Sequence, residues 1–298
     1  MTTGIILDIK HFEMHDGDGL RTTLFLKGCP LRCAWCHNPE SFSATPQLAS
    51  YAFKCVACGT CAAVCPVGAH TVGENGHIFH REKCVACGRC ERVCPKNALK
   101  LFGRKVTVED VLDELLADRS FYAATGGGVT VSGGEPLVQS EFCTEILKAL
   151  KQEGVNTAVD TSLFVPRAAI EAVAPYTDTF LVDVKAMDDG VHRAYTGQSN
   201  ALIFENVRAL DQMGKRIEAR MVLVPTVNDG LFEAAADFLA ELKNLSAVKV
   251  LPYHRLALAK YEALGIPYPL ADVPVPTEEE RARAEESLAA RGIKIIRD

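Results

Sequence analysis

Eleven of the twelve cysteines in this 298-residue chain lie in three short clusters, and their spacing limits the possible folds more than any other feature. The first cluster is a C-x3-C-x2-C loop formed by Cys29, Cys33 and Cys36. A cubane iron-sulfur cluster is usually held by four cysteines. A loop with three cysteines leaves one iron open to bind and reduce a substrate. We therefore expect a cluster here that acts as a reagent as well as an electron carrier.

The other two clusters repeat each other, at residues 54–66 and 83–95. Each has the pattern C-x2-C-x2-C-x3-C-P, which is typical of bacterial two-cluster ferredoxins, where the fourth cysteine of each run binds the cluster of the other run. We therefore assign Cys55, Cys58, Cys61 and Cys94 to one 4Fe-4S cluster, and Cys84, Cys87, Cys90 and Cys65 to the other. Because all the irons of such clusters are capped, the pattern predicts electron transfer and no direct chemistry.

Structural zinc is the main alternative for these two runs, because C-x2-C pairs also suit a tetrahedral zinc ion. Zinc has no use for a third cysteine two residues on or for the terminal proline, whereas crossed cubane ligation uses all eight cysteines. We also expect no disulfides, because the N-terminal residues lack the pattern of a secretory signal and we therefore expect a reducing compartment. The remaining cysteine, Cys143, has no partner at metal spacing, and we expect it in the core.

Composition argues against several classes of function. Apolar residues make up 48% of the chain and charged residues 23%, as in globular soluble proteins. The formal net charge is -6 and there is no long run of lysine or arginine, so we expect no nucleic-acid partner. No stretch approaches the roughly eighteen apolar residues of a membrane span, so we expect no membrane association and a cytoplasmic location.

Outside residues 47–102, strand-like and helix-like apolar patterns alternate, which predicts repeated β/α units and a parallel sheet. We expect strands over 23–27, 128–131, 155–159, 180–184, 216–224, 247–251 and 293–296. We expect helices over 107–118, 140–152, 168–173, 202–213, 231–243 and 278–290. Parallel β/α folds gather reactive groups at the carboxyl ends of their strands. The residues that follow predicted strands are Cys29, Gly133, Gly134, Glu135, Asp160, Asp183 and His254, and we expect them to share one site.

The segment from Asp16 to Asn38 resembles the activating enzymes of glycyl radical enzymes, a branch of the radical S-adenosylmethionine (SAM) superfamily. The residues that fall at this family's spacings are Gly17, Gly19, Arg21, Phe25, Gly28, the three cysteines and Asn38. One departure is Asp18, where the family usually has proline and therefore a stiffer turn. The resemblance implies an α/β fold: a partial, open (β/α)6 TIM-like barrel of the radical SAM type with an inserted bacterial ferredoxin-like domain. The core would comprise residues 1–46 and 103–298, and the insert residues 47–102.

The resemblance also implies how SAM is held. Its amino and carboxylate groups would chelate the open iron, and residues 133–136 look like the family's GGEP loop. There the glycines would let the backbone approach the methionine moiety, while carbonyls or the Glu135 carboxylate would accept from its ammonium. The residues that the resemblance assigns to SAM are Trp35, His37, Gly133, Gly134, Glu135, Asp183, Lys185, Arg220 and His254. Among them, Arg220 would pair with the SAM carboxylate.

Two further assignments concern other ligands. Asp160 and Thr161, together with Asp183, look like the family's site for a monovalent cation beside the SAM carboxylate. The Asp-Gly-Asp-Gly loop that begins at Asp16 is a candidate for docking the glycine loop of a partner enzyme.

Some of these assignments also have a purely structural alternative, and the GGEP loop could be an ordinary glycine turn. Trp35 could be a core residue, His254 a hydrogen-bonded core histidine, and Asp160 and Thr161 capping residues. The Gly126-Gly127-Gly128 run fits neither the dinucleotide nor the phosphate-loop pattern, and we interpret it as a hinge.

Three functions remain on sequence grounds. The first is a glycyl radical enzyme activator, in which a flavodoxin or ferredoxin reduces the two inserted clusters and these reduce the third. Cleavage of SAM then yields a 5'-deoxyadenosyl radical that takes hydrogen from a glycine of the partner enzyme. The second is another radical SAM enzyme with auxiliary clusters, acting on a small molecule or maturing another protein. The third is a pure electron carrier, which would not release 5'-deoxyadenosine and would not need so many β/α units.

Overall fold

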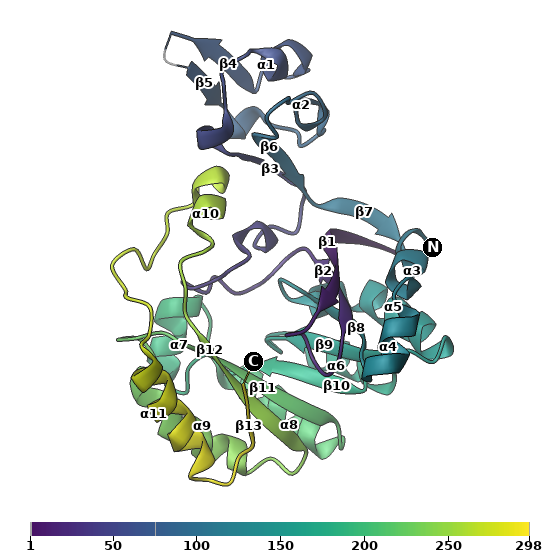
Figure 1. The fold of residues 1–298 in the computed structure, drawn as a ribbon, viewed down its shortest axis with the longest axis vertical. Helices are drawn as coiled ribbons and strands as arrows, with labels where there is room; N and C mark the ends of the chain where they lie inside the picture. Colours follow the sequence, from purple (N-terminus) through teal and green to yellow (C-terminus); the bar gives the residue numbers. More distant parts are fainter. Residues whose placement is uncertain (1, 75, 298) are drawn as a thin grey trace.

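The computed structural model describes residues 2–74 and 76–297. Its main body is built on a nine-stranded sheet with the strand order β13-β12-β11-β10-β9-β8-β2-β1-β7 (Figure 1). The two end strands of this order, β13 and β7, do not pair with each other, so the sheet curves without closing. This arrangement confirms the predicted α/β class with a partial barrel.

The neighbouring strands from β2 to β13 all run parallel. They are β2 (Arg21–Leu26), β8 (Gly128–Gly133), β9 (Asn156–Thr161), β10 (Thr179–Asp183), β11 (Arg216–Leu223), β12 (Leu245–Pro252) and β13 (Ile295–Ile296). All seven were predicted to within a few residues. In this nine-stranded sheet, two strands were not predicted, and both are antiparallel to their neighbours. Strand β1 (Thr3–Glu13) pairs with β2, and β7 (Arg104–Thr107) pairs with β1.

Helix α5 (Ser140–Gln152) shows how the connecting helices are specified. Its apolar side chains recur at helical spacing, and Phe142, Cys143, Ile146 and Leu150 are all buried in the main core. Both ends of α5 and the core position of Cys143 agree with the prediction. The other helices of the barrel are α3 (Glu109–Leu116), α4 (Arg119–Thr125), α6 (Arg167–Val173), α7 (Asp189–Thr196), α8 (Ala201–Gln212), α9 (Phe232–Ala240), α10 (Leu258–Leu264) and α11 (Glu278–Ala289). Of these, α4, α7 and α10 were not predicted.

Residues 47–102 form a lobe at one end of the molecule, away from the large sheet (Figure 1). In this lobe β3 (Gln47–Ser50) pairs antiparallel with β6 (Leu99–Phe102), and β4 (His70–Gly73) with β5 (Gly76–Phe79). Two short helices, α1 (Thr60–Val64) and α2 (Arg89–Arg92), lie within the cysteine runs. The lobe packs on the barrel through Ala49 and Phe102, which contact Ala263 and Leu264 of α10.

No helix in the described ranges is both long enough and apolar enough to cross a membrane.

The Gly126-Gly127-Gly128 run is a close-packed junction and not the hinge that we predicted. Gly126 ends α4 with a φ of 72°. A Cβ atom on Gly127 would lie 1.8 Å from the carbonyl oxygen of Leu20, and one on Gly128 would lie 2.0 Å from that of Asn156. Gly127 and Gly128 are therefore held against Leu20, which precedes β2, and Asn156, the first residue of β9, and only glycine fits at these two positions.

This packing predicts different costs for two neighbouring substitutions. Gly126→Ala meets open space and should cost only the ~1 kcal/mol of a left-handed backbone. Gly127→Ala forces β2 and β8 apart and should lower the free energy of unfolding by about 3 kcal/mol. Urea unfolding of the metal-free protein, followed by circular dichroism, measures both. Equal losses at the two positions would contradict the packing role.

Candidate active site

The carboxyl ends of the parallel strands open into a cleft of about 450 Å³. All three cysteines of the first cluster line it, namely Cys29, Cys33 and Cys36. The predicted SAM contacts that also line it are Trp35, His37, Gly133, Gly134, Asp183, Lys185 and His254. The structure therefore brings together residues from four separate segments of the chain, as expected for a parallel sheet. Whether they contact SAM stays a prediction.

The cysteine loop and the GGEP loop are joined by main-chain hydrogen bonds. The Glu135 amide donates to the carbonyl of Gly28 at 2.9 Å, and the Gly134 amide donates to that of Leu26 at 3.0 Å. A Cβ atom on Gly134 would lie 2.3 Å from the Gly28 oxygen. Glycine is therefore needed at this position for the two loops to approach each other, beyond any approach to a ligand.

The Glu135 carboxylate is fully buried beneath this junction and does not line the cleft. Its Oε1 accepts from Thr161 Oγ1 at 2.7 Å and from the Leu137 amide at 3.1 Å. Its Oε2 accepts from the Ser162 amide at 2.8 Å and from Ser162 Oγ at 2.6 Å. Burial raises the pKa of Glu135, while these four donors favour the ionised form. The side chain thus ties the GGEP loop to the end of β9, and the loop's carbonyls remain the groups available to an ammonium.

The environment of the three thiols suits a buried iron-sulfur cluster. Burial raises the pKa of Cys29 to about 12 and also raises the pKa values of Cys33 and Cys36. Without a metal these thiols are therefore neutral, and a bound iron cluster would have to supply the charge that makes them thiolates. Although burial opposes it, the carboxylate of Asp183 raises the pKa of Lys185, whose ammonium lies 2.8 Å from Asp183 Oδ2. The Lys185 side chain lines the same cleft as the three thiols.

Trp35, His37 and His254 lie around the cleft in different settings. Trp35 is 8% exposed and packs with Leu31, Val224 and Tyr253, so it is a core residue that also lines the cleft. His37 and His254 are exposed, with their rings in an edge-to-face contact at 4.8 Å. The alternative of a buried, satisfied His254 is therefore wrong.

Arg220 lies in the interior of the barrel next to the Asp-Gly-Asp-Gly loop and does not line the cleft. Its Nη2 donates to the carbonyl of His15 at 2.6 Å, and its Nη1 lies 3.5 Å from Asp16 Oδ1 and 3.7 Å from Asp160 Oδ1. Thr23 Oγ1 also donates to Asp16, at 2.8 Å. In this structure Arg220 thus connects β11 with the loop, and its pairing with a SAM carboxylate stays a prediction.

Asp18, which stands where the family usually has proline, forms an ion pair with Arg216. Arg216 at the start of β11 donates from Nη1 to Asp18 Oδ2 at 2.6 Å. An ion pair therefore restrains the turn where the family has a proline ring.

The three side chains expected at the cation site have protein partners. Asp160 accepts from Ser132 Oγ at 2.6 Å, Thr161 donates to Glu135, and Asp183 pairs with Lys185. Burial raises the pKa of Asp160 to about 7, and the nearby Arg220 opposes this rise. A cation there remains a prediction.

The sequence analysis missed two residues that hold the cysteine loop. Lys260 on α10 donates to the His37 carbonyl at 3.2 Å, to Asn38 Oδ1 at 3.0 Å and to Glu40 Oε1 at 2.7 Å. Tyr261 donates to the Cys36 carbonyl at 3.2 Å. The sequence did contain a signal for helix α10, because a run of helix-forming residues ends at Gly265, a glycine with a φ of 68° at the end of the helix.

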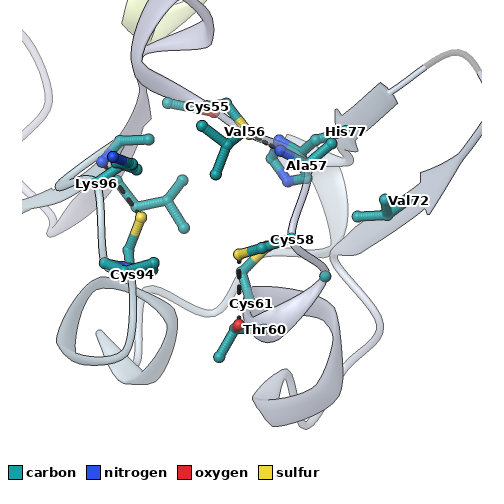
Figure 2. A pocket seen from close by; sticks show the side chains of 15 residues that line it. Cys55, Val56, Ala57, Cys58, Thr60, Cys61, Val72, His77, Cys94 and Lys96 are labelled. Atoms are coloured by element: carbon teal, nitrogen blue, oxygen red, sulfur yellow. Dashed lines mark hydrogen bonds between the residues drawn. The ribbon is translucent and has the colours of Figure 1, made fainter.

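The eight cysteines of the lobe line two separate cavities. The first contains Cys55, Cys58, Cys61 and Cys94, and Figure 2 shows Cys94 of the second run placed with the three cysteines of the first. The second contains Cys84, Cys87, Cys90 and Cys65. Each cavity therefore collects three cysteines from one run and the fourth from the other. All twelve cysteines of the chain are free thiols in the structure.

His70 and His77, to which the sequence analysis gave no role, lie between the two cavities: His77 lines the first and His70 lines the second. Their rings stack at 5.1 Å, His70 Nδ1 lies 2.9 Å from His77 Nε2, and both offer a nitrogen within 4.8 Å of the Cys61 sulfur. They come from the paired strands β4 and β5, so only strand pairing brings them together.

The carboxylate of Glu135 generates a prediction. Glu135→Gln replaces one accepting oxygen with an amide that faces backbone and hydroxyl donors, so we expect a loss of about 2 kcal/mol in the free energy of unfolding. The exposed Glu141→Gln on α5 is the matched control and should change it by less than about 0.5 kcal/mol. Urea unfolding measures both. A Gln variant as stable as the parent protein would show that the four bonds do not hold the loop.

Comparisons with known proteins agree with this geometry. A model of the radical SAM superfamily matches residues 23–239. The chain is 43% identical over 282 residues to the (2S)-3-sulfopropanediol dehydratase activating enzyme of Klebsiella oxytoca, which covers 91% of this chain and 89% of that protein. It is 39% identical over 290 residues to the choline trimethylamine-lyase activating enzyme of Oleidesulfovibrio alaskensis, with coverage of 94% and 93%.

A solved structure supports the fold. The radical SAM methyltransferase from Sphaerobacter thermophilus aligns with a TM-score of 0.55 at 18% identity, covering 97% of this chain and 76% of that one. Taken with the cleft and its three cysteines, these similarities show that the chain belongs to the radical SAM superfamily and, within it, to the activating enzymes of glycyl radical enzymes.

Proposed function

We propose that this protein activates a glycyl radical enzyme by using Cys29, Cys33 and Cys36 to hold a SAM-cleaving 4Fe-4S cluster. The observation that carries the proposal is the number of thiols in the cleft: within the described residues, three cysteines line it and no fourth does. Eight others line the cavities of the lobe, and Cys143 is buried in the barrel core. When bound, such a cluster supplies the electron that breaks the sulfur–carbon bond of SAM, yielding methionine and a 5'-deoxyadenosyl radical.

The protein's own groups hold and orient SAM. The carbonyls of Gly133 and Gly134 would accept from its ammonium, because the Glu135 carboxylate already accepts four hydrogen bonds. The Asp183–Lys185 pair would supply charges to the cleft, and Trp35, His37 and His254 would supply rings suited to the adenine. Arg220 and a monovalent cation at Asp160, Thr161 and Asp183 would act on the carboxylate.

The lobe would act as a ferredoxin-like domain that delivers the electron. Four cysteines in each cavity match the ligand number of a closed 4Fe-4S cluster, and their crossed origin matches the ferredoxin pattern. A flavodoxin or ferredoxin would be the donor. A closed cluster offers no open iron, so these two clusters transfer electrons only.

Helix α10 supports a fixed path from the lobe to the active site. Arg81 of the lobe donates from Nη2 to the Ala263 carbonyl at 2.6 Å and from Nη1 to that of Leu48 at 3.2 Å. One turn earlier in α10, Lys260 and Tyr261 bind the segment that follows Cys36. One helix therefore contacts both the lobe and the cysteine loop.

The partner's glycine would reach the cleft beside the Asp-Gly-Asp-Gly loop. His15, next to Asp16, lines the cleft, so this loop forms part of its wall. Asp16 is held by Thr23 and Arg220, which fixes its position for a partner peptide.

Two measurements on the anaerobically reconstituted protein test the function. With dithionite and SAM it should release 5'-deoxyadenosine, and Cys33→Ala should abolish release because only two cluster thiols remain. Incubated with (2S)-3-sulfopropanediol dehydratase or choline trimethylamine-lyase as candidate partners, it should produce a glycine-centred doublet in electron spin resonance. Release of 5'-deoxyadenosine with hydrogen abstraction from a free metabolite would instead favour the small-molecule alternative.

The relay generates a separate prediction. Cys58→Ala removes one thiol from the first lobe cavity, so we expect turnover with reduced flavodoxin to fall much more than turnover with dithionite, which can reduce the active cluster directly. Cys143→Ala, a buried cysteine outside the clusters, is the control and should affect both reductants alike. Equal losses with both reductants in Cys58→Ala would mean that the lobe serves folding and not electron delivery.

A further inference from the structure

Charge is distributed unevenly between the lobe and the barrel. Residues 47–102 contain seven lysines and arginines, three glutamates and no aspartate, whereas the rest of the chain contains 25 basic and 35 acidic residues. Counted with neutral thiols, the lobe is therefore basic in a protein whose formal net charge is -6. Two closed 4Fe-4S clusters with four thiolates each would offset this net charge, so the exposed cations themselves, and not the net charge of the lobe, would attract an acidic partner. Local charge opposite in sign to that of the whole protein can steer and orient an oppositely charged partner.

Four of these basic residues, which we call the basic rim, flank the two cysteine cavities. Lys96 lines the first cavity and Arg89 the second, while Lys54 and Lys83 directly precede the first cysteine of each run. All four are exposed. Within the described residues of the lobe, the recorded ion pair is that of His80 with Glu82, so the basic rim has no internal carboxylate partner.

Each cavity also has an exposed apolar side chain at its edge. Val56 lines the first cavity and is 57% exposed, and Val85 lines the second and is 60% exposed. Cys58 and Cys87 are themselves exposed, so each cavity reaches the surface. Apolar contacts surrounded by unpaired charge are a common composition for protein interfaces.

We propose that the basic rim docks an acidic one-electron carrier protein, whose carboxylates pair with Lys54, Lys83, Arg89 and Lys96 while its apolar contact covers Val56 and Val85. The inference rests on the proposed relay and adds the surface at which the electron enters. One electron leaves the carrier and one enters a lobe cluster; no bond is made or broken. The occupant is a transient carrier because electron-transfer encounters have small interfaces, which electrostatic steering makes fast.

A charge reversal at the cavity edges tests the docking. The probe is reduced flavodoxin, an acidic carrier, mixed by stopped flow with the fully loaded enzyme, and the absorbance of the lobe clusters is followed. In the parent protein the second-order rate constant should fall as salt is raised, because steering is screened. In Lys54→Glu/Lys83→Glu, which changes the two rim lysines that do not line a cavity, it should fall at low salt by about tenfold or more and lose most of its salt dependence.

A matched control makes the same change in net charge on the barrel, away from the basic rim. Lys243→Glu/Arg283→Glu alters two exposed cations of the barrel and should leave the flavodoxin rate within about twofold of the parent value. Iron content and 5'-deoxyadenosine release with dithionite should stay unchanged in both double variants; loss of that release in the parent protein would reject the proposed function instead.

Three results would overturn the docking proposal. One is a parent rate without salt dependence, and another is an equal fall in both double variants. The third is a rim variant that reacts normally with flavodoxin but fails, under dithionite, to activate the partner enzyme, which would assign this surface to the activated enzyme.

Discussion

The site depends on one main-chain contact, the pairing of the cysteine loop with the GGEP loop. Strands β2 and β8 run parallel, so both loops leave the sheet at the same edge, and the Glu135 amide bonds to the Gly28 carbonyl. Any side chain at Gly134 would collide with that carbonyl. Beneath the junction, the buried Glu135 carboxylate binds Thr161 and Ser162 and so fixes a third strand end. Main-chain hydrogen bonds thus join two strand ends, and the Glu135 side chain joins them to a third, which holds the shape of the cleft.

A second set of contacts connects the lobe to this cleft. Helix α10 follows β12, receives Arg81 from the lobe near its C-terminus, and sends Lys260 to the segment after Cys36. Lys27 strengthens the connection from within the barrel, because its buried ammonium donates to the Glu40 carbonyl and to Gln47 Oε1, the first residue of the lobe. These hydrogen bonds hold together two parts of the molecule that are joined by only two chain crossings.

The accuracy of the sequence predictions follows the strength of each local signal. Helix α5 was predicted at both ends because its apolar residues have strict helical spacing, and the parallel strands were predicted because they are short apolar runs. Strand β1 was missed because much of its second half is exposed and carries the charged residues Asp8, Lys10 and Glu13, so it lacks an apolar pattern. Its pairing with β2 is visible only in the tertiary structure. The glycine run was misread as a hinge, since glycine is required equally by a flexible turn and by a tightly packed one, and only the neighbours Leu20 and Asn156 distinguish them.

By itself the sequence determined the spacing of the cysteines within each run, the α/β class and the order of the motifs at the strand ends. These features depend on residue identity and on short-range periodicity. The tertiary structure decided which groups remain available for a ligand. It occupied the Glu135 carboxylate with four donors, directed Arg220 toward the loop at Asp16, and brought Lys260 to the cysteine loop from more than two hundred residues away. Such roles depend on which buried donor lies nearest each acceptor, and that is set only when distant segments pack together.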